Sequence, residues 1–129
     1  MPESKEYCLT NKQRKQLQHE IKNYLTKYFK ILLIKAADYH KVEIWNDFLI
    51  FRAHGFLTES DKQIIKLPGG SDKIKEARLQ VVKKYASDNL AYFEEKLGAK
   101  CIHQIYDMDV VKDLFIHVMI FDKVFIEVN

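Results

Sequence analysis

One stretch of the sequence has residue types that could bind an anion: Pro68-Gly69-Gly70-Ser71, just ahead of a long amphipathic segment. Glycine lets a ligand approach the backbone closely, and the free amides at the start of a helix attract negative charge. The candidate anion-binding residues are Gly69, Gly70, Ser71, Lys73 and Arg78, with Lys66 and Lys75 nearby in sequence. The spacing matches neither the P-loop nor the dinucleotide-binding fingerprint. A site for a small anion, a nucleotide or RNA is therefore one hypothesis, and a helix-to-helix corner capped by Ser71 explains the same residues.

Two of the five histidines could act as a pair. His103 and His117 lie in two successive predicted strands, and if these strands pair, the two imidazoles could face each other and hold a metal or move protons. A closed zinc site needs about four ligands, and no third ligand is placed by the sequence. We therefore predict no metal site and expect both histidines to be structural or exposed to solvent.

The other reactive side chains form no recognisable catalytic arrangement. Cys101 sits among apolar neighbours in a predicted strand, where a thiol is normally inert. Asp107, Asp109 and Asp113 cluster in a predicted polar turn, but the twelve-residue loop and closing Glu of a known calcium site are missing. We predict no catalytic residue and no cofactor, and we interpret the chain as non-enzymatic.

Composition argues against nucleic acid as a partner and against membrane insertion. The 21 Lys and Arg side chains exceed the 18 Asp and Glu by a net charge of +3, and the two signs alternate along the chain. No apolar run approaches the roughly 20 residues of a spanning helix, and residues 1–15 lack the apolar core of a secretion signal. We expect a cytoplasmic protein in which Cys8 and Cys101 remain thiols.

The first half of the chain predicts a helix and then a β-hairpin. Thr10 and Gln13 have capping-box spacing, and apolar residues then recur every three or four positions from about residue 11 to the low thirties. The period changes to two at Lys41, and the apolar run resumes at Phe48 after the turn residues Asn46-Asp47.

The second half predicts two helices and two strands. Thr58 begins a short helix that ends near Lys66, and Ser71-Asp72 opens a long helix that Gly98 ends in a left-handed conformation. Residues 100–106 and 114–121 predict strands on either side of a polar turn at 107–113. For residues 122–128 a bulge, a turn and an exposed step before a further apolar run all remain open.

Together these elements predict an α+β fold with the order α-β-β-α-α-β-β. Two hairpins would form one antiparallel four-stranded sheet with the helices packed on one face, as a two-layer sandwich. We expect one domain over residues 1–129, with 1–10 as a flexible tail. Because residues 48–51 and 114–121 are apolar on both sides of their strands, the uncovered side predicts a homodimer.

Three stretches of the sequence carry a family resemblance: Asp47-Phe48-Leu49-Ile50-Phe51-Arg52-Ala53-His54-Gly55-Phe56-Leu57-Thr58-Glu59-Ser60-Asp61, Lys75-Glu76-Ala77-Arg78 and Leu97-Gly98-Ala99-Lys100. In these stretches the chain resembles the small bacterial MpsC-like family. The family motif matches at Gly55, Leu57, Thr58 and Asp61, and a later basic helix residue matches Arg78. The family's Gly-rich turn before the first strand is replaced by residues 34–40. The resemblance implies an α+β fold and an accessory or regulatory protein of unknown detailed function, linked to a membrane-bound system for cation translocation and membrane potential. It brings no established catalytic residues.

Overall fold

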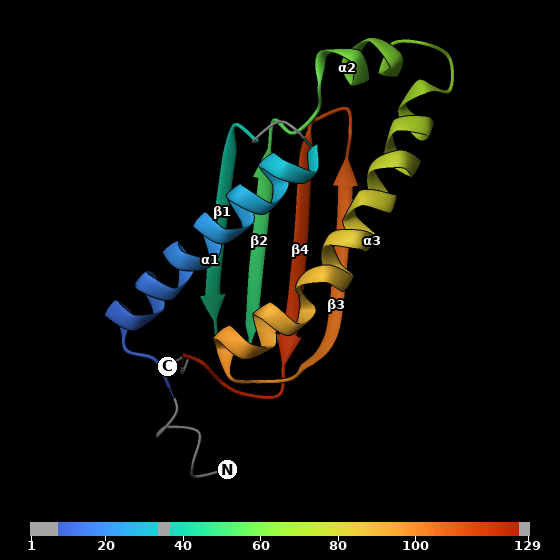
Figure 1. The fold of residues 1–129 in the computed structure, drawn as a ribbon. Coiled ribbons are helices and arrows are strands. Elements are labelled where there is room, and N and C mark those ends of the chain that lie inside the picture. The colour runs from blue at the N-terminus through green and yellow to red at the C-terminus, as the bar shows by residue number, and fades with distance from the viewer. Residues whose placement is uncertain (1–7, 34–36, 127–129) are drawn as a thin grey trace.

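The computed structural model describes residues 8–33 and 37–126, and its elements follow the predicted order (Figure 1). They are α1 (Asn11–Leu33), β1 (Tyr39–Trp45), β2 (Phe48–His54), α2 (Glu59–Ile65), α3 (Gly70–Leu97), β3 (Cys101–Asp109) and β4 (Leu114–Phe121). The α+β class is confirmed. Residues 1–7 of the predicted tail, 34–36 of the segment that departs from the family pattern, and 127–129 lie outside the described residues.

The strands form one sheet with the order β1-β2-β4-β3. β1 pairs with β2 and β3 pairs with β4, each as a hairpin, while β2 pairs with β4 in the middle of the sheet. All three pairings are antiparallel. Both predicted hairpins therefore exist, and they join through their second strands.

Local signals in the sequence fix several element ends. Thr10 and Gln13 hydrogen-bond each other's backbone amides with their side chains at 2.9 and 3.1 Å, as a capping box requires. Asn46 has a positive φ of 51° in the turn between β1 and β2. Gly98 ends α3 in the left-handed conformation, with φ 62°. These three predictions are confirmed.

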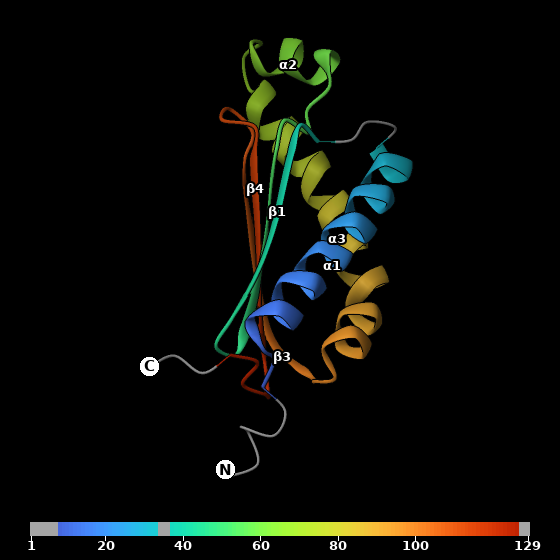
Figure 2. The same ribbon diagram turned by 90° about the vertical axis from the view of Figure 1, so that its left-hand side faces the viewer.

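The molecule has two layers, because α1 and α3 lie on the same side of the sheet (Figure 2). α2 lies at one end of the sheet, where β2 leads into it (Figures 1 and 2). Burial alternates along the strands, with the buried positions under the helices. The covered face of the sheet carries the buried side chains of the strands, which are His40, Val42, Ile44, Leu49, Phe51, Ala53, Met108, Phe115, His117, Met119 and Phe121.

We call the opposite side of the sheet the open face, because none of the helices that the structure describes packs on it (Figure 2). It consists of four rows of residues paired across the strands: a first row of Trp45, Phe48, Ile120 and His103; a second of Glu43, Ile50, Val118 and Ile105; a third of Lys41, Arg52, Ile116 and Asp107; and a fourth of Tyr39, His54, Leu114 and Asp109.

The predicted boundary between strand and turn at 107 is wrong. β3 continues to Asp109, which pairs with Leu114, so only residues 110–113 form the turn. Aspartate has a low intrinsic preference for strands, but pairing with β4 supplies the backbone hydrogen bonds that override it.

Candidate functional site

The glycines of the predicted anion site are required by packing at the corner between α2 and α3. Gly69 has a left-handed backbone with φ 71° and is the N-cap of α3, so the predicted capping role of Ser71 is wrong. A Cβ added to Gly70 would lie 1.7 Å from the carbonyl oxygen of Ile64. Ser71 and Lys73 lie in the first turn of α3, Ser71 half-buried and Lys73 exposed. The corner thus needs both glycines whether or not an anion binds there.

Arg78, another candidate anion-binding residue, pairs with an acidic side chain of the protein itself. Its guanidinium donates a hydrogen bond to the carboxylate of Asp61, and both side chains are mostly buried. Asp61 also accepts from the Thr58 amide at 3.1 Å, while its own amide donates to the Thr58 hydroxyl at 3.1 Å. Burial raises the pKa of Asp61, but the hydrogen bonds from Arg78 and the Thr58 backbone outweigh this and lower the pKa below its usual value. Arg78 therefore ties α3 to the capping box of α2.

The segment from Gly55 to Leu57, which precedes that capping box, is held by Asp113. The Asp113 carboxylate accepts hydrogen bonds from the amides of Phe56 and Leu57 at 2.9 and 3.1 Å, and its backbone carbonyl accepts from Gly55 at 3.1 Å. Gly55 has a φ of 74°, which favours glycine. Sequence reasoning missed this role of Asp113, because nothing local indicates that the β3–β4 turn meets the end of β2.

The proposed pairing of His103 with His117 is wrong. His103 pairs with Ile120 on the open face, whereas His117 is fully buried on the covered face. The offset arises because a β-bulge precedes His103 and because alternate strand residues point to opposite faces. The two imidazoles therefore cannot bind one metal ion.

His117 instead belongs to a buried hydrogen-bond network. Its Nδ1 lies 2.6 Å from the Tyr85 hydroxyl, and its Nε2 lies 2.9 Å from the side-chain oxygen of Gln104. Nε2 therefore carries the proton and donates to Gln104, while Nδ1 accepts from Tyr85. Burial lowers the pKa of His117 to about 4, and burial also raises the pKa of Tyr85. Both groups are neutral at pH 7, which suits a structural contact.

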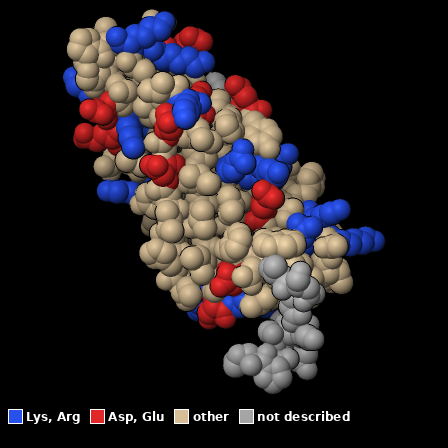
Figure 3. All heavy atoms as spheres, turned by 180° about the vertical axis from the view of Figure 1, so that it is seen from behind, with Lys and Arg blue, Asp and Glu red and all other residues tan. Residues whose placement is uncertain are grey.

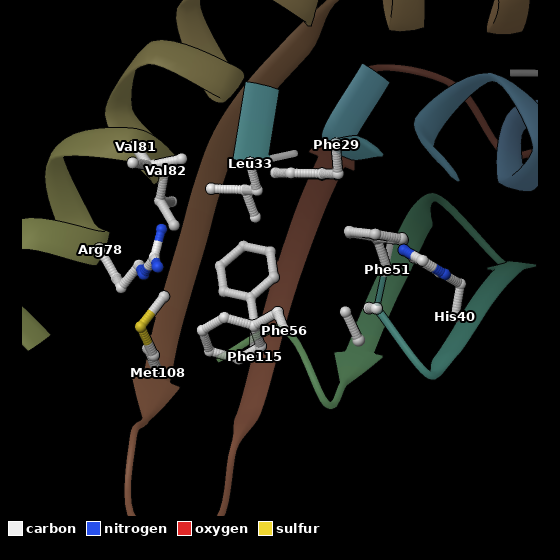
Figure 4. Close-up of a pocket in the computed structure, with 12 residues that line it drawn as sticks. Phe29, Leu33, His40, Phe51, Phe56, Arg78, Val81, Val82, Met108 and Phe115 are labelled. Carbon is white, nitrogen blue, oxygen red and sulfur yellow. The ribbon is translucent and has the colours of Figure 1, made fainter. Parts of the chain in front are cut away.

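A small cavity lies between the C-terminal end of α1, α3 and the sheet. Figure 4 shows Arg78 and Met108 on one side of it, His40 on the other, and Phe56 and Phe115 between them. Its volume is about 30 Å³, close to the space of a single water molecule. Nε2 of His40 is buried there without a hydrogen-bond partner among the described residues, and burial lowers the pKa of this histidine.

The open face carries apolar side chains that the helices do not cover. Its first and second rows place Phe48, Ile50, Val118 and Ile120 in the middle of the sheet, all only half-buried. At the edges of these rows Trp45 is 42% and Ile105 is 52% exposed. Figure 3 shows this face, with an uncharged surface across much of its lower half. Contiguous apolar surface of this kind marks an interaction site more often than a solvated exterior.

Metal ligands do not gather in the described part of the chain. Within residues 8–33 and 37–126, no group of three or more His, Cys, Asp or Glu is placed to hold a metal ion. Asp107 and Asp109 lie on the open face, whereas Asp113 is engaged by backbone amides at the end of β2. Among the helices that the structure describes, none combines the length and the apolar character needed to cross a membrane.

Comparisons with known proteins identify the family. The matching family model is described as "Na+-translocating membrane potential-generating system (MpsC)" and covers residues 13–123. The uncharacterized protein YrhF of Bacillus subtilis (strain 168) is 24% identical over 106 residues, which are 81% of this chain and 87% of YrhF. The search of solved structures gave no significant match. Because the family model spans all seven helices and strands except the first two residues of α1, the chain belongs to the MpsC family.

Proposed function

We propose that this protein is a non-enzymatic, cytosolic accessory or regulatory component of a membrane system that translocates cations and generates membrane potential, and that it acts as a homodimer. The observation that carries the proposal is the family match over residues 13–123. The family description names a Na+-translocating system, and this chain would serve that system through contacts with other proteins.

The roles of the buried polar groups support a binding function over catalysis. His117 is held between Tyr85 and Gln104, and Asp61 is held by Arg78 and Thr58. A general base or nucleophile needs an unoccupied lone pair directed at a substrate. These side chains direct theirs at neighbouring protein groups, so they stabilise the fold.

The composition and the open face support the remaining parts of the proposal. Cys8 and Cys101 are thiols, as in most proteins of a reducing compartment. The half-buried apolar side chains of the open face give a second protein a surface to cover. The homodimer uses that surface, and contact with the membrane system uses another part of the molecule.

The test is deletion of the gene in its native host, followed by measurement of membrane potential with a voltage-sensitive dye over a range of external Na+. We expect the Na+-dependent part of the potential to change and to return on complementation with the wild-type gene. Chemical cross-linking in intact cells should also join the protein to a subunit of a cation transporter. An unchanged Na+ dependence, with no transporter subunit cross-linked, would contradict the proposal.

The anion-binding alternative predicts a different result for the purified protein. Saturable, salt-sensitive binding of a nucleotide or RNA, lost in Lys73→Glu, would favour it. Gly70 is unsuitable for that test, because any side chain there collides with the backbone of α2. Turnover of a substrate that one point substitution abolishes would favour an enzyme instead.

A further inference from the structure

We propose that the open face packs against the same face of a second copy, about a two-fold axis that runs parallel to the strands. This inference deepens the homodimer part of the proposed function and rests on it. Sheets that pack face to face keep their strand directions within about 30° of each other. A two-fold axis between two such identical faces then runs either along the strands or across them.

An axis along the strands leaves each row opposite itself and exchanges its ends. β1 then faces β3 of the second copy, and β2 faces β4. In the middle of the first two rows Phe48 meets Ile120 and Ile50 meets Val118, because these residues are register partners. At the ends of the second row Glu43 comes opposite Ile105. The apolar centre of the face is thereby complementary to itself.

The charged third row is complementary to itself in the same arrangement. Lys41, at the β1 edge, lies opposite Asp107, at the β3 edge of the second copy, and symmetry makes this pair twice. Arg52 lies opposite Ile116, beside that same Asp107. In the fourth row, Tyr39 comes opposite Asp109, which can accept a hydrogen bond from the phenol.

An axis across the strands gives a poorer match. It keeps each strand opposite itself and reverses the rows, so that Lys41 meets Glu43. The same operation sets Arg52 against Ile50 and Asp107 against Ile105. Each arrangement sets two charged residues against apolar ones, which is unfavourable in both. The axis across the strands also sets Phe48 opposite His54, whereas the axis along the strands keeps the four central apolar residues of the first two rows opposite one another. The axis along the strands is therefore preferred.

Lys41 and Asp107 each make an ion pair within one copy, and these ion pairs do not oppose dimer formation. Lys41 lies 3.7 Å from Glu43, and Lys75 reaches around the sheet edge to lie 3.6 Å from Asp107. The Asp107 side chain is 74% exposed and the Lys41 side chain is 46% exposed. Exposed pairs contribute little, so covering the face can replace or extend them.

The size of the face sets the expected affinity. Strands about 4.8 Å apart, with a rise of about 3.4 Å per residue, make a four-stranded face on the order of 15 by 23 Å. Its area of about 350 Å² is less than half of the about 800 Å² that each partner buries in a standard stable interface, so we expect weak association. We expect a dimer with a dissociation constant in the micromolar range.

The experiment is sedimentation equilibrium of the full chain from about 1 to 500 µM, at about 0.15 M salt so that only near charges matter. The wild type should dimerise. Lys41→Glu and Asp107→Lys should each weaken self-association about tenfold or more, because each places like charges opposite one another twice. An equimolar mixture of these two variants should regain the wild-type affinity, since both facing pairs are then opposite in sign.

Matched controls carry the same charge changes on the helical side of the molecule. Lys27→Glu in α1 and Glu95→Lys in α3 are exposed positions away from the open face and should leave the dissociation constant within about twofold. Circular dichroism of every variant checks that the monomer still folds.

Each contrary outcome has a distinct meaning. A wild type that stays monomeric at the highest concentration overturns both this inference and the homodimer, while the membrane link is still tested by the Na+ dependence of the potential. A dimer that neither variant weakens, or that the mixture fails to restore, overturns this arrangement alone. Rescue of Lys41→Glu by Glu43→Lys instead of by Asp107→Lys also overturns it, because that rescue requires the axis across the strands.

Discussion

The covered and open faces of the sheet are made by the same strands, yet they differ in how completely their apolar side chains leave water. Leu49 and Ile50 are neighbours in β2 with side chains of equal size. Leu49 is fully buried under the helices, whereas Ile50 on the open face is only half-buried. The apolar side chains of the covered face are thus buried within the chain, whereas those of the open face stay partly exposed and are the ones that the proposed dimer would cover.

The faces differ in polar groups as well. The covered face places one of its histidines, His117, between two hydrogen-bond partners in the core. The open face keeps His103 exposed, together with a row of charges. One side therefore has the features of a fixed core, and the other those of an interface with a polar rim.

The largest expected effect on stability comes from truncating Leu49 or Ile50, the neighbours in β2. Leu49→Ala should lower the free energy of unfolding by about 3 kcal/mol or more, because it opens a cavity in the packed core. Ile50→Ala should cost only about 1 kcal/mol in the monomer, since less surface is buried there. Urea unfolding at low protein concentration measures both.

The same pair tests the partner on the open face. If a second copy covers Ile50, the cost of Ile50→Ala rises with protein concentration, whereas the cost of Leu49→Ala stays constant. Equal costs at every concentration would remove the distinction between the two faces.

The pH dependence of stability tests the burial of His117. Its expected effect is nearly as large as that of Leu49→Ala. The pKa of His117 is lowered by burial to about 4, whereas an unfolded chain has a histidine pKa of about 6.5. The unfolded state therefore binds the proton first as pH falls. Stability is complete above about pH 6.5 and decreases toward pH 4, by about 3 kcal/mol for this group. Urea unfolding between pH 7 and pH 4 measures the decrease.

Substitution of the buried histidine tests the source of this pH dependence in the same urea-unfolding experiment. His117→Gln should flatten the pH dependence but not abolish it, because burial also lowers the pKa of His40. Asp61 contributes little above pH 4, because the stability that its lowered pKa supplies is lost only as pH falls through the unfolded value of about 3.9 toward the lower folded one. A slope that His117→Gln leaves unchanged would contradict the buried placement of this residue.

The smallest expected difference concerns one ion pair from each side of the sheet. Asp61→Asn should cost about 2 kcal/mol, because it weakens the cap of α2 and leaves the mostly buried Arg78 without its counter-ion. Glu43→Gln on the open face should change stability by less than about 0.5 kcal/mol, since its pair with Lys41 is exposed. Thermal unfolding of the two variants at pH 7 gives the comparison, and similar shifts in Tm would contradict it.

Much of the fold could be predicted from short-range signals. The capping residues Thr10 and Thr58, the Asn46-Asp47 turn and Gly98 each act on backbone within a few residues, so the sequence alone indicates where the elements begin and end. The uncovered apolar side of the strands was predictable for the same reason, because alternation along a strand is a local property.

The candidate sites depended on contacts between distant residues and were predicted less well. From the sequence, Gly70 is a candidate for binding an anion. In the structure, the nearby carbonyl of Ile64 leaves no room for a side chain, so packing requires the glycine. From the sequence, Asp113 belongs to an acidic cluster. In the structure, its carboxylate accepts hydrogen bonds from backbone amides that follow β2. No local pattern distinguishes these alternatives.

By itself the sequence determined the type and order of the elements, since helix caps, tight turns and apolar periodicity act over a few residues. Only the tertiary structure decided which histidine is buried, which charges share a row and how the two hairpins join. Those outcomes follow from strand register, where a shift of one residue moves every side chain to the other face of the sheet.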